Sequence, residues 1–272
     1  MKFSIIIILF IILCILYIKK EEFTNIISKY KSRLSDKPKI LHLVLFSHDD
    51  GPYDMMYKLT SKFYKSYSNV TTYYYCFDPN INEKYKIKAD ILYIKGDEGY
   101  IPNILDKTIK AFEFFNDFDY DYIVRSNIST IINFNLLSDK LLKDNPDYGG
   151  GVTAIDKLNS EAGIIDTNLI GLNYVSGTNI ILSNKTVNRI LENTCQCTPC
   201  IGTQNNINYA LIDDVAIGLL IRDYMPDIEL TRYNDYYTLE YETMKDYIFY
   251  RNRTDDRYKD VENMKIIINN IS

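Results

Sequence analysis

Short apolar runs alternate with segments of helical periodicity along most of the chain. The almost wholly apolar run at 40–46 (ILHLVLF) is typical of a buried strand in a parallel sheet. The β-branched and aromatic residues at 70–77 predict a second strand, and the helical spacing of Met56, Leu59 and Phe63 predicts a helix between the two. Further strands are predicted at 90–94, 121–124, 174–182 and 247–250, and further helices at 104–115, 136–142, 187–191, 215–220 and 261–271. This alternation predicts an α/β fold, in which helices cover both faces of an open, mostly parallel sheet.

The N-terminal segment differs from the rest because residues 3–18 are apolar except for one serine. A helix of this length spans roughly 24 Å, and the lysines on either side of it can reach the membrane surface. We therefore predict a transmembrane anchor at 3–18, a short polar stem at 19–38 and a single domain at 39–272. The alternatives are a cleaved signal peptide, which calls for small residues before the cut, and a buried helix. The basic residues after the segment favour a cytoplasmic domain, and the Asn-x-Ser/Thr sequons do not settle the orientation.

Composition and charge narrow the function. The chain has 31 Lys and Arg, 36 Asp and Glu and a formal charge of −5, and 46% of its residues are hydrophobic, which is typical of a folded globular protein. An acidic chain lacks the basic surplus for binding nucleic acid through its phosphates, so we expect no nucleic-acid partner. Cys195, Cys197 and Cys200 form a C-x-C-x-x-C pattern, for which a loop disulfide, free thiols and a metal site stay open.

Polar clusters follow several predicted strands at the point where each strand ends. Ser47, His48, Asp49 and Asp50 follow the first strand, Asp78 follows the second, and Arg125, Asn127 and Ser129 follow the strand at 121–124. In open sheets of this class, ligands bind beyond the carboxyl ends of the strands, so these side chains are candidate ligand contacts. Ordinary solvated turns are the alternative. The acidic segment at 117–121 precedes its strand and faces the opposite edge, so we interpret its D-x-D spacing as solvated charge.

Two further clusters lie late in the sequence. Asp213 and Asp214 open the predicted helix at 215–220, where the helix dipole stabilises carboxylates. One of these acids can cap the helix while the other points into a cleft and acts as a base. Arg251 and Arg253 follow the last predicted strand, and the paired donors of a guanidinium group suit a diphosphate. Surface charges paired with neighbouring aspartates are the alternative for the two arginines.

Four motifs resemble, in order and rough spacing, those of inverting GT-A glycosyltransferases, particularly the fringe and β-1,3-galactosyltransferase type. They are Glu98-Gly-Tyr100-Ile-Pro-Asn103 with Lys107 and Thr108, Tyr122-Ile-Val-Arg125-Ser-Asn127-Ile-Ser129 with Asn133, Tyr174-Val-Ser176-Gly177, and Asp213-Asp214-Val215 with Gly218. The resemblance covers about residues 40–225. The chain is also similar to the compact glycosyltransferase-like proteins of large DNA viruses.

The resemblance implies a GT-A fold and a hexosyltransferase type of reaction. A sugar would pass from a nucleotide donor, usually UDP-linked, to a hydroxyl of a glycan or glycoprotein, with inversion at the anomeric carbon. The resemblance assigns the general base to Asp214 and places Ser176 and Gly177 on the acceptor side. Asp213 would support either the start of the helix or the acceptor. We expect donor contacts from Ser47, His48, Asp49, Asp50, Asp78, Arg125, Asn127, Arg251 and Arg253. The resemblance also implies a single-pass protein of a secretory-pathway (Golgi or ER) membrane.

The metal site of the family is altered in this sequence. The family holds Mn²⁺ or Mg²⁺ with a D-x-D at the end of the fourth strand, where this chain has Asn127 and Ser129. Neutral oxygens hold a hard dication more weakly than carboxylates do, yet the leaving diphosphate still needs positive charge. Three alternatives follow: a metal held weakly by Asn127 and Ser129, replacement of the metal by Arg125, Arg251 and Arg253, or an inactive GT-A-like protein that binds glycans or a partner. A nucleotidyltransferase is a further alternative, although the chain lacks a glycine-rich phosphate loop.

Overall fold

The computed structural model describes residues 37–194, 205–233, 235–236 and 247–271. From Pro38 onward the described residues belong to one compact unit. The predicted anchor at 3–18, most of the predicted stem and the three cysteines of the C-x-C-x-x-C pattern lie outside the described residues. Across the described ranges, no helix has the length and apolarity that crossing a membrane requires.

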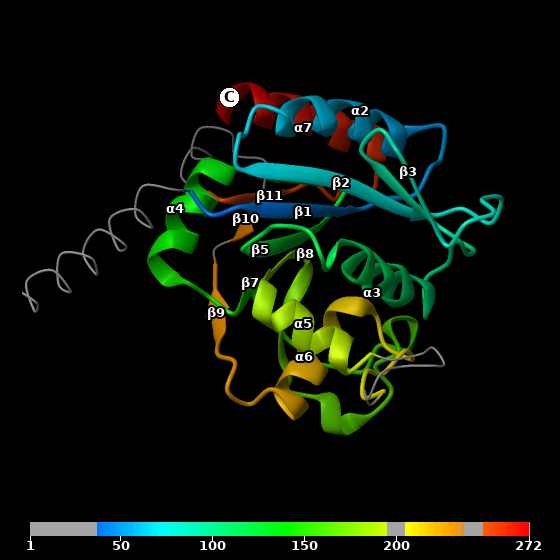
Figure 1. Cartoon of the computed structure of the whole chain (residues 1–272), viewed down its shortest axis with the longest axis vertical. Helices are drawn as coiled ribbons and strands as arrows, with labels where there is room; N and C mark the ends of the chain where they lie inside the picture. Colours follow the sequence, from blue (N-terminus) through cyan, green and yellow to red (C-terminus); the bar gives the residue numbers. More distant parts are fainter. Residues whose placement is uncertain (1–36, 195–204, 234, 237–246, 272) are drawn as a thin grey trace, which may run out of the picture. The chain divides into compact units, whose positions relative to one another are not determined.

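A mixed sheet of eight strands runs through the middle of the described residues (Figure 1). In spatial order the strands are β3 (Tyr85–Lys88), β4 (Ile91–Ile94), β2 (Val70–Phe77), β1 (Ile40–Leu45), β5 (Tyr122–Asn127), β8 (Asn173–Ser183), β7 (Tyr148–Ala154) and β9 (Leu230–Arg232). The block of β4, β2, β1 and β5 is parallel, whereas β3 and β8 pair with it in antiparallel orientation. The carboxyl ends of the parallel strands therefore meet at one edge, where Leu45 of β1 is in register with Asn127 of β5.

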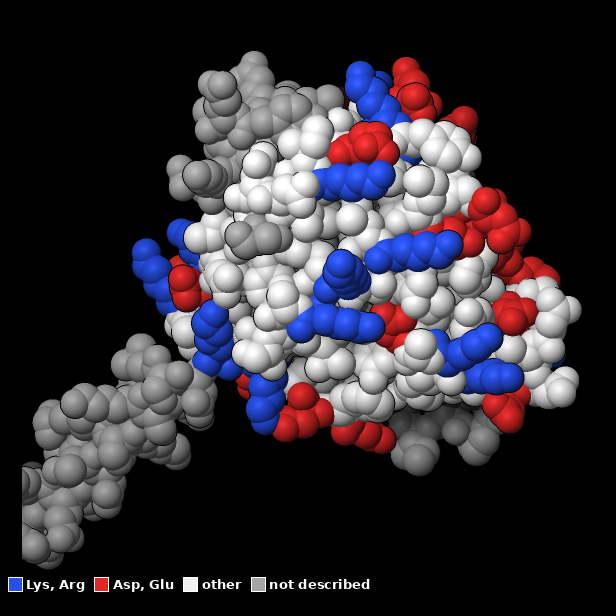
Figure 2. Space-filling view, turned by 90° about the horizontal axis from the view of Figure 1, so that it is seen from above, with Lys and Arg blue, Asp and Glu red and all other residues white. Residues whose placement is uncertain are grey.

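Helices cover both faces of this sheet (Figure 1). One face carries α2 (Pro52–Tyr64) and α7 (Arg257–Ile271), and the other carries α3 (Asn103–Phe115), α5 (Asn184–Glu192) and α6 (Asp213–Tyr224). The apolar side of α4 (Phe134–Asp144) belongs to the same buried cluster as α2 and α7. Seen from the side of α2 and α7, Lys and Arg side chains cross the middle of the surface and Asp and Glu lie around them (Figure 2).

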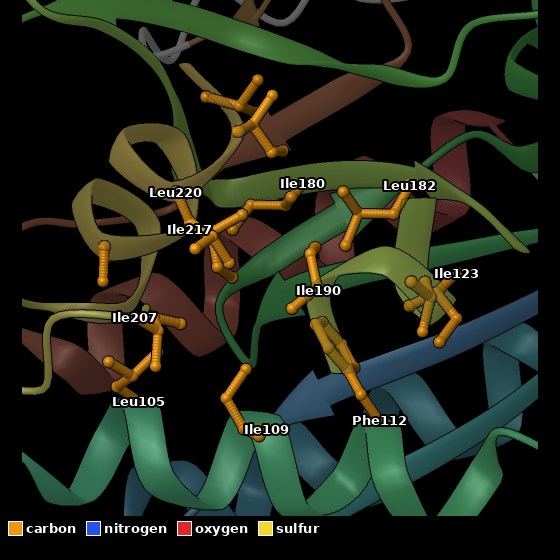
Figure 3. Packing of buried hydrophobic residues seen from close by; sticks show 14 of the residues in the cluster. Leu105, Ile109, Phe112, Ile123, Ile180, Leu182, Ile190, Ile207, Ile217 and Leu220 are labelled. Atoms are coloured by element: carbon orange, nitrogen blue, oxygen red, sulfur yellow. The ribbon is translucent and has the colours of Figure 1, made fainter. Parts of the chain in front are cut away.

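Each face buries its own hydrophobic cluster, because successive side chains of a strand point to opposite faces of the sheet. Leu41 of β1 packs in the cluster under α3, α5 and α6, whereas its neighbour Ile40 packs in the cluster under α2 and α7. Figure 3 shows the first cluster with Leu105, Ile109 and Phe112 of α3, Ile190 of α5, Ile217 and Leu220 of α6, and Ile180 and Leu182 of β8. This packing holds α6 beside α3 and so fixes where the first turn of α6 lies.

A second, three-stranded sheet brings the C-terminal segment to the same edge. Its strand β11 (Phe249–Arg251) pairs antiparallel with β6 (Thr130–Ile132) and parallel with β10 (Asp235–Tyr236). The register sets Arg251 opposite Thr130, just beyond the end of β5. The residues that follow β5 and those that follow β11 are therefore neighbours, although they are far apart in the sequence.

The predicted α/β class is confirmed, with a mostly parallel sheet and helices on both faces. The sequence did not indicate β7, because glycines have little propensity for strands. A Cβ atom at Gly150 would lie 2.0 Å from the carbonyl oxygen of Asn179 in β8, and the φ of Gly150 is +142°. Gly150 therefore permits the close pairing of β7 with β8. The glycines at 149–151 lie inside a strand rather than in a phosphate-binding loop.

Candidate active site

A cavity of about 430 Å³ opens at the carboxyl ends of β1 and β5. Its walls come from the ends of these strands, from α2 and α3, and from the segment that follows β11. The structure brings together five of the residues expected at the site from the sequence: Ser47, Asn127, Ser129, Arg251 and Arg253. This is the edge at which ligands bind in open α/β sheets.

The cavity is cationic although the chain as a whole is acidic. Lys107, Arg251, Arg253 and Arg257 line it, and Glu98 is the one acidic residue among the described lining residues. A cleft lined by one sign of charge concentrates the field of these charges and raises the local concentration of counter-ions. The cavity therefore suits a ligand with several negative charges on a small volume, such as a diphosphate.

Lys107 of α3 ties three segments together at the base of this cavity. Its side chain is 1% exposed, and its Nζ lies 2.6 Å from Glu98 Oε2 and 3.2 Å from the carbonyl oxygen of Phe46. The other oxygen of Glu98 accepts a hydrogen bond from the backbone N–H of Phe77 at 2.8 Å. Burial lowers the pKa of Lys107, and the Glu98 carboxylate opposes that effect. The ion pair thus fixes the loop before α3 against the ends of β1 and β2.

Arg257 is the first residue of α7 and reaches the cavity from the opposite side. Its Nη1 donates hydrogen bonds to Asp260 Oδ2 and, at 3.3 Å, to the carbonyl oxygen of Asn252. The guanidinium carbon lies 5.3 Å from the centre of the Tyr53 ring of α2, which is a cation–π distance. Its Nε is buried and has no hydrogen-bond partner among the described residues.

Arg251 and Arg253 reach the cavity because the small sheet anchors the segment between them. The backbone N–H of Asn252 donates a hydrogen bond to the carbonyl oxygen of Ser129 at 3.0 Å, and its side-chain amide donates to the same oxygen at 3.2 Å. Asn252 is buried, whereas Arg251 is half-buried and Arg253 is exposed. The two arginines therefore flank a fixed point, with Arg253 at the rim.

Arg125 and Asp213 form a buried ion pair next to the cavity. Arg125 Nη2 lies 2.6 Å from Asp213 Oδ2, and the two side chains are 1% and 2% exposed. Arg125 Nη1 also donates hydrogen bonds to Asn127 Oδ1, at 3.0 Å, and to the carbonyl oxygen of Gly177. Arg125 was expected among the donor contacts and Asp213 at the helix start or on the acceptor side, but neither lines the cavity. Through Asn127 the pair links the cavity wall to the start of α6.

Asp214 is held by two backbone amides at the start of α6. Its Oδ2 accepts a hydrogen bond from the N–H of Gly177 and its Oδ1 accepts one from the N–H of Val215, each at 2.8 Å. Burial and the neighbouring Asp213 carboxylate raise the pKa of Asp214 to about 6, while the amide hydrogen bonds and Arg125 oppose the shift. The side chain is partly exposed. An oriented, accessible carboxylate with a raised pKa is what a general base near neutral pH requires.

Gly177 leaves room for this arrangement. A Cβ atom at that position would lie 2.8 Å from Arg125 Nη1 and 3.3 Å from Asp214 Oδ2. The first distance is shorter than side chains tolerate, so the absence of a side chain at Gly177 allows Arg125 and Asp214 to meet the same stretch of β8. Of the predicted acceptor-side residues, Gly177 is therefore in direct contact with the candidate base.

Tyr100 lies within electrostatic range of both the candidate base and the cationic rim. It precedes α3 and is 51% exposed. Burial raises the pKa of its phenol, the Asp214 carboxylate raises it further, and Arg253 lowers it. The charges of Asp214 and Arg253 therefore both act on this exposed aromatic residue. A ring in that position offers a flat surface on which a sugar or another ligand group can pack.

Two residues of the first-strand loop make contacts away from the cavity lining. His48 Nδ1 lies 3.0 Å from Asp54 Oδ1, and its Nε2 lies 3.3 Å from the hydroxyl of Tyr93. Asp49 accepts hydrogen bonds from the backbone N–H groups at the start of α2, including that of Tyr53 at 3.1 Å. Asp49 therefore caps this helix, which is the structural role that aspartate commonly has in such a position.

Three more predicted residues lie at turns or beside the candidate base. Asp50 is exposed and has a φ of +52°, in the left-handed region. Asp78 accepts a hydrogen bond from the backbone amide two residues on, which closes the turn after β2. Ser176 Oγ lies 3.0 Å from Thr178 Oγ1 on β8, next to Gly177. Neither aspartate lines the cavity.

Several residues of the site have roles that the sequence alone does not predict. Glu98, Tyr100 and Lys107 belong to a motif of the resemblance, but their spacing does not show that they meet the ends of β1 and β2. Arg257 looks like a surface charge beside two aspartates, whereas its partner is Asp260, one turn along α7. The signal available in the sequence was the helical spacing that places Asp260 on the same side of the helix as Arg257.

The residues at the expected metal position do not fit a divalent cation. The side-chain oxygen of Asn127 accepts a hydrogen bond from the Arg125 guanidinium, and Ile128 between the two expected ligands is buried and apolar. Among the described residues, no group of three or more His, Cys, Asp or Glu side chains has a metal-binding arrangement. The acidic segment at 117–121 does not add a ligand set, because Asp119 and Asp121 bind Lys39 near the start of β1, at the opposite edge of the sheet.

Comparison with known proteins finds similarity of structure but none of sequence. No protein-family model matches the chain, and no curated protein matches its sequence. Among solved structures, the chain is similar to "a glycosyltransferase involved in the glycosylation of the major capsid of PBCV-1". The two share 10% sequence identity with a TM-score of 0.45, over 84% of this chain and 100% of that chain. Because this similarity is so distant, the residues of the site have to carry the functional inference.

Proposed function

We propose that the chain is an inverting glycosyltransferase of the GT-A type, which moves a hexose from a nucleoside-diphosphate donor to an acceptor hydroxyl. The placement of Asp214 is the observation that carries this proposal. Its carboxylate is oriented by the Gly177 and Val215 amides and has a pKa raised toward neutrality. Asp214 does not line the cationic cavity, but Gly177 and Arg125 connect it to Asn127 on the cavity wall. The resemblance of the four sequence motifs gives the reaction type and makes a UDP-linked sugar the first donor to test.

The proposed reaction needs one base and one site for negative charge. The acceptor oxygen attacks the anomeric carbon, and its proton passes to the carboxylate of Asp214. The bond between the anomeric carbon and the diphosphate oxygen breaks, and its electron pair stays on the diphosphate. Attack from the side opposite the leaving group inverts the configuration. The cations of the cavity stabilise the charge that develops on the leaving diphosphate.

In the proposal, each substrate takes its own part of the site. The nucleotide lies by Ser47, at the end of β1, and the diphosphate lies by the cavity arginines. The acceptor lies on the side of Ser176 and Gly177, where Asp214 reaches its hydroxyl. Of the two parts expected for Asp213, we propose support of the helix start, because its carboxylate is buried against Arg125. Its role in the proposal is to hold Arg125 and the start of α6 in place.

A non-catalytic protein that binds glycans or a partner is the second candidate. The observation that favours it is the neutral pair Asn127 and Ser129 at the place where the family holds a metal. A glycan-binding protein would not need charge at that position. The two functions differ in turnover, since a binding protein releases no nucleotide from any donor.

The proposed place of the enzyme is a secretory-pathway membrane, to which residues 3–18 attach it by a single span. The apolar sequence of that segment supports this part of the proposal. We expect the full-length chain to stay in the membrane pellet after alkaline carbonate washing, and a chain without residues 1–20 to move to the supernatant. Release of the full-length chain by carbonate would contradict the anchor.

The experiment that tests the reaction is a screen of nucleotide sugars with the full-length chain in detergent. UDP-linked hexoses come first, followed by GDP-linked sugars, with nucleotide release as the readout and simple glycosides as acceptors. The proposal expects turnover with at least one donor and a product whose anomeric configuration, read by NMR, is the opposite of the donor's. Retained configuration would exclude the single displacement by way of Asp214. A folded sample that binds UDP but releases nucleotide from no donor would favour the binding protein.

A further inference from the structure

We infer that the cavity neutralises the donor's diphosphate with the chain's own cations, Arg251, Arg253 and Arg257 with Lys107 behind them, and needs no divalent metal. This inference rests on the proposed function and deepens it, because it names the groups that take the place of the metal. The family that the motifs resemble uses a metal at this point, so the inference sets this chain apart from it.

The expected metal position is already occupied by positive charge. Arg125 Nη1 lies 3.0 Å from Asn127 Oδ1, the oxygen that a metal would need. A dication there would lie beside a guanidinium group in a buried environment, where like charges repel strongly. The Arg125 charge is itself balanced by Asp213, so that carboxylate is not available as a metal ligand. The position therefore holds a fixed internal ion pair in place of a metal.

The cavity supplies the missing positive charge from other elements. Its four cations come from α3, from the segment after β11 and from the start of α7, so they surround the cavity from more than one side. Guanidinium groups present paired N–H donors that match the oxygens of a phosphate. Proteins therefore favour Arg where a phosphate is held by bidentate hydrogen bonds. The Nε of Arg257 is buried and has no hydrogen-bond partner among the described residues, so protein contacts do not use all the donors of this guanidinium group.

Lys107 adds to the positive electrostatic potential of the cavity without contacting the diphosphate directly. Its ammonium group already lies against Glu98 and two oxygens of the β1 end. Glu98 pairs with Lys107 and Asp260 pairs with Arg257, yet the four cations that line the cavity still outnumber these two carboxylates. The charge of a nucleoside diphosphate is of the same order and of opposite sign. In the transfer step, the electron pair of the broken bond adds charge to the diphosphate, and the arginines stabilise that charge where a metal would otherwise do so.

The test is a calorimetric titration of the full-length chain in detergent with UDP and, separately, with inorganic pyrophosphate. Each titration is run in EDTA and again with Mn²⁺. We expect both ligands to bind in EDTA, with UDP affinities that agree within about twofold between the two conditions. We expect Arg253→Gln to weaken UDP binding about tenfold, which is the effect of losing one charge-assisted hydrogen bond. Binding that appears only with Mn²⁺ would overturn the inference.

Matched variants separate the cavity from general charge effects. Arg222→Gln removes an exposed arginine of α6 that pairs with Asp223, and it should leave UDP binding unchanged. Arg253 is exposed at the rim, so its replacement is not expected to disturb the fold, whereas Arg257→Gln also removes contacts with Asp260 and Asn252. Wild-type UDP affinity in Arg253→Gln and in a folded Arg257→Gln would overturn the inference.

The same samples distinguish failure of this inference from failure of the proposed function. UDP and pyrophosphate binding in EDTA, together with no turnover of any donor, would support the cationic cavity and contradict the glycosyltransferase. Sugar transfer that occurs only with Mn²⁺ would support the glycosyltransferase and contradict the metal-free cavity. Failure of a folded sample to bind either ligand in EDTA would contradict the inference, whatever the turnover.

Discussion

Arg125 and Asp213 meet at 2.6 Å in the interior of the protein, although 88 positions separate them in the sequence. Arg125 also donates to Asn127 on the cavity wall and to the carbonyl oxygen of Gly177. The neighbour of Asp213 is the candidate base, Asp214, which accepts from the N–H of Gly177. One guanidinium group therefore fixes the distance between the cationic cavity and the base. In the proposed reaction, this distance sets how the donor meets the acceptor.

Replacement of Asp213 should destabilise the fold. Asp213→Ala leaves the Arg125 guanidinium buried without its counter-charge, and breaking such a pair costs roughly 3–5 kcal/mol. Urea unfolding, followed by circular dichroism, measures the change in the free energy of unfolding. Asp223→Asn is the control, since it removes an exposed carboxylate from the other end of α6. A loss below roughly 1 kcal/mol for Asp213→Ala, as for an exposed pair, would contradict the structural role given to the ion pair.

The rate of sugar transfer should depend on pH through Asp214. A general base works in its deprotonated form, and burial with the Asp213 charge raises the pKa of Asp214 to about 6. We therefore expect kcat/KM to rise as the pH increases through about 6 and to level off above it. Kinetics between pH 4.5 and 8 at constant ionic strength check this. A profile that is already flat from pH 4.5 to 8 would contradict a base with a raised pKa.

The same pKa predicts a stability effect with a definite sign. The folded-state pKa of Asp214 lies above its ordinary value of 3.8, so between pH 3.8 and about 6 the folded protein binds more protons than the unfolded chain. The stabilising contribution of the protonated carboxyl is therefore lost as the pH rises through that window. Asp214→Asn should gain stability relative to wild type on going from pH 4 to pH 7.5. Parallel unfolding curves that keep the same offset at both pH values would contradict the raised pKa.

Gly177→Ala should damage catalysis more than folding. The added methyl group would meet Arg125 Nη1 at 2.8 Å, so that guanidinium group has to shift, and Asp214 Oδ2 at 3.3 Å, so the base has to give way by a few tenths of an ångström. A displacement of about 1 Å at a catalytic group costs on the order of a hundredfold in rate, so for this smaller shift we expect a loss of about tenfold in turnover. Gly171→Ala is the comparison, because nothing lies within 4 Å of that position although its φ is +88°. It should cost stability and leave turnover intact, and equal turnover of the two variants would contradict the close approach at Gly177.

Much of the fold follows from local patterns. The apolar run at 40–46 and the aromatic run at 70–77 become β1 and β2 because strands buried on both faces need apolar side chains throughout. The predicted strands also locate the cavity, because parallel strands end at the same edge of the sheet and ligands bind there. The sequence did not predict β7 because glycine is rare in strands. Gly150 is needed there for the close pairing with β8, and this contact depends on the tertiary structure.

The assignments of individual site residues were harder to predict. The sequence shows that Arg125 lies at the end of a strand, but not that its guanidinium group is buried against Asp213 of α6 behind the cavity wall. Asp213, the ion-pair partner that holds Arg125 in this position, lies far from it in the sequence. Lys107 lies on the buried stripe of α3, where a lysine is uncommon, and only the fold shows the oxygens that surround it. Long-range charge pairing therefore sets which polar residues face the cavity.

The most direct test of the proposed function compares Asp214→Asn with wild type and with Asp223→Asn, using the donor that the screen identifies. Turnover and UDP affinity are measured on the same samples. The account predicts that Asp214→Asn keeps wild-type UDP affinity and loses at least about a hundredfold in turnover, the usual contribution of a general base, while Asp223→Asn matches wild type. Turnover of a folded Asp214→Asn within about tenfold of wild type would contradict the assignment of Asp214 as the base.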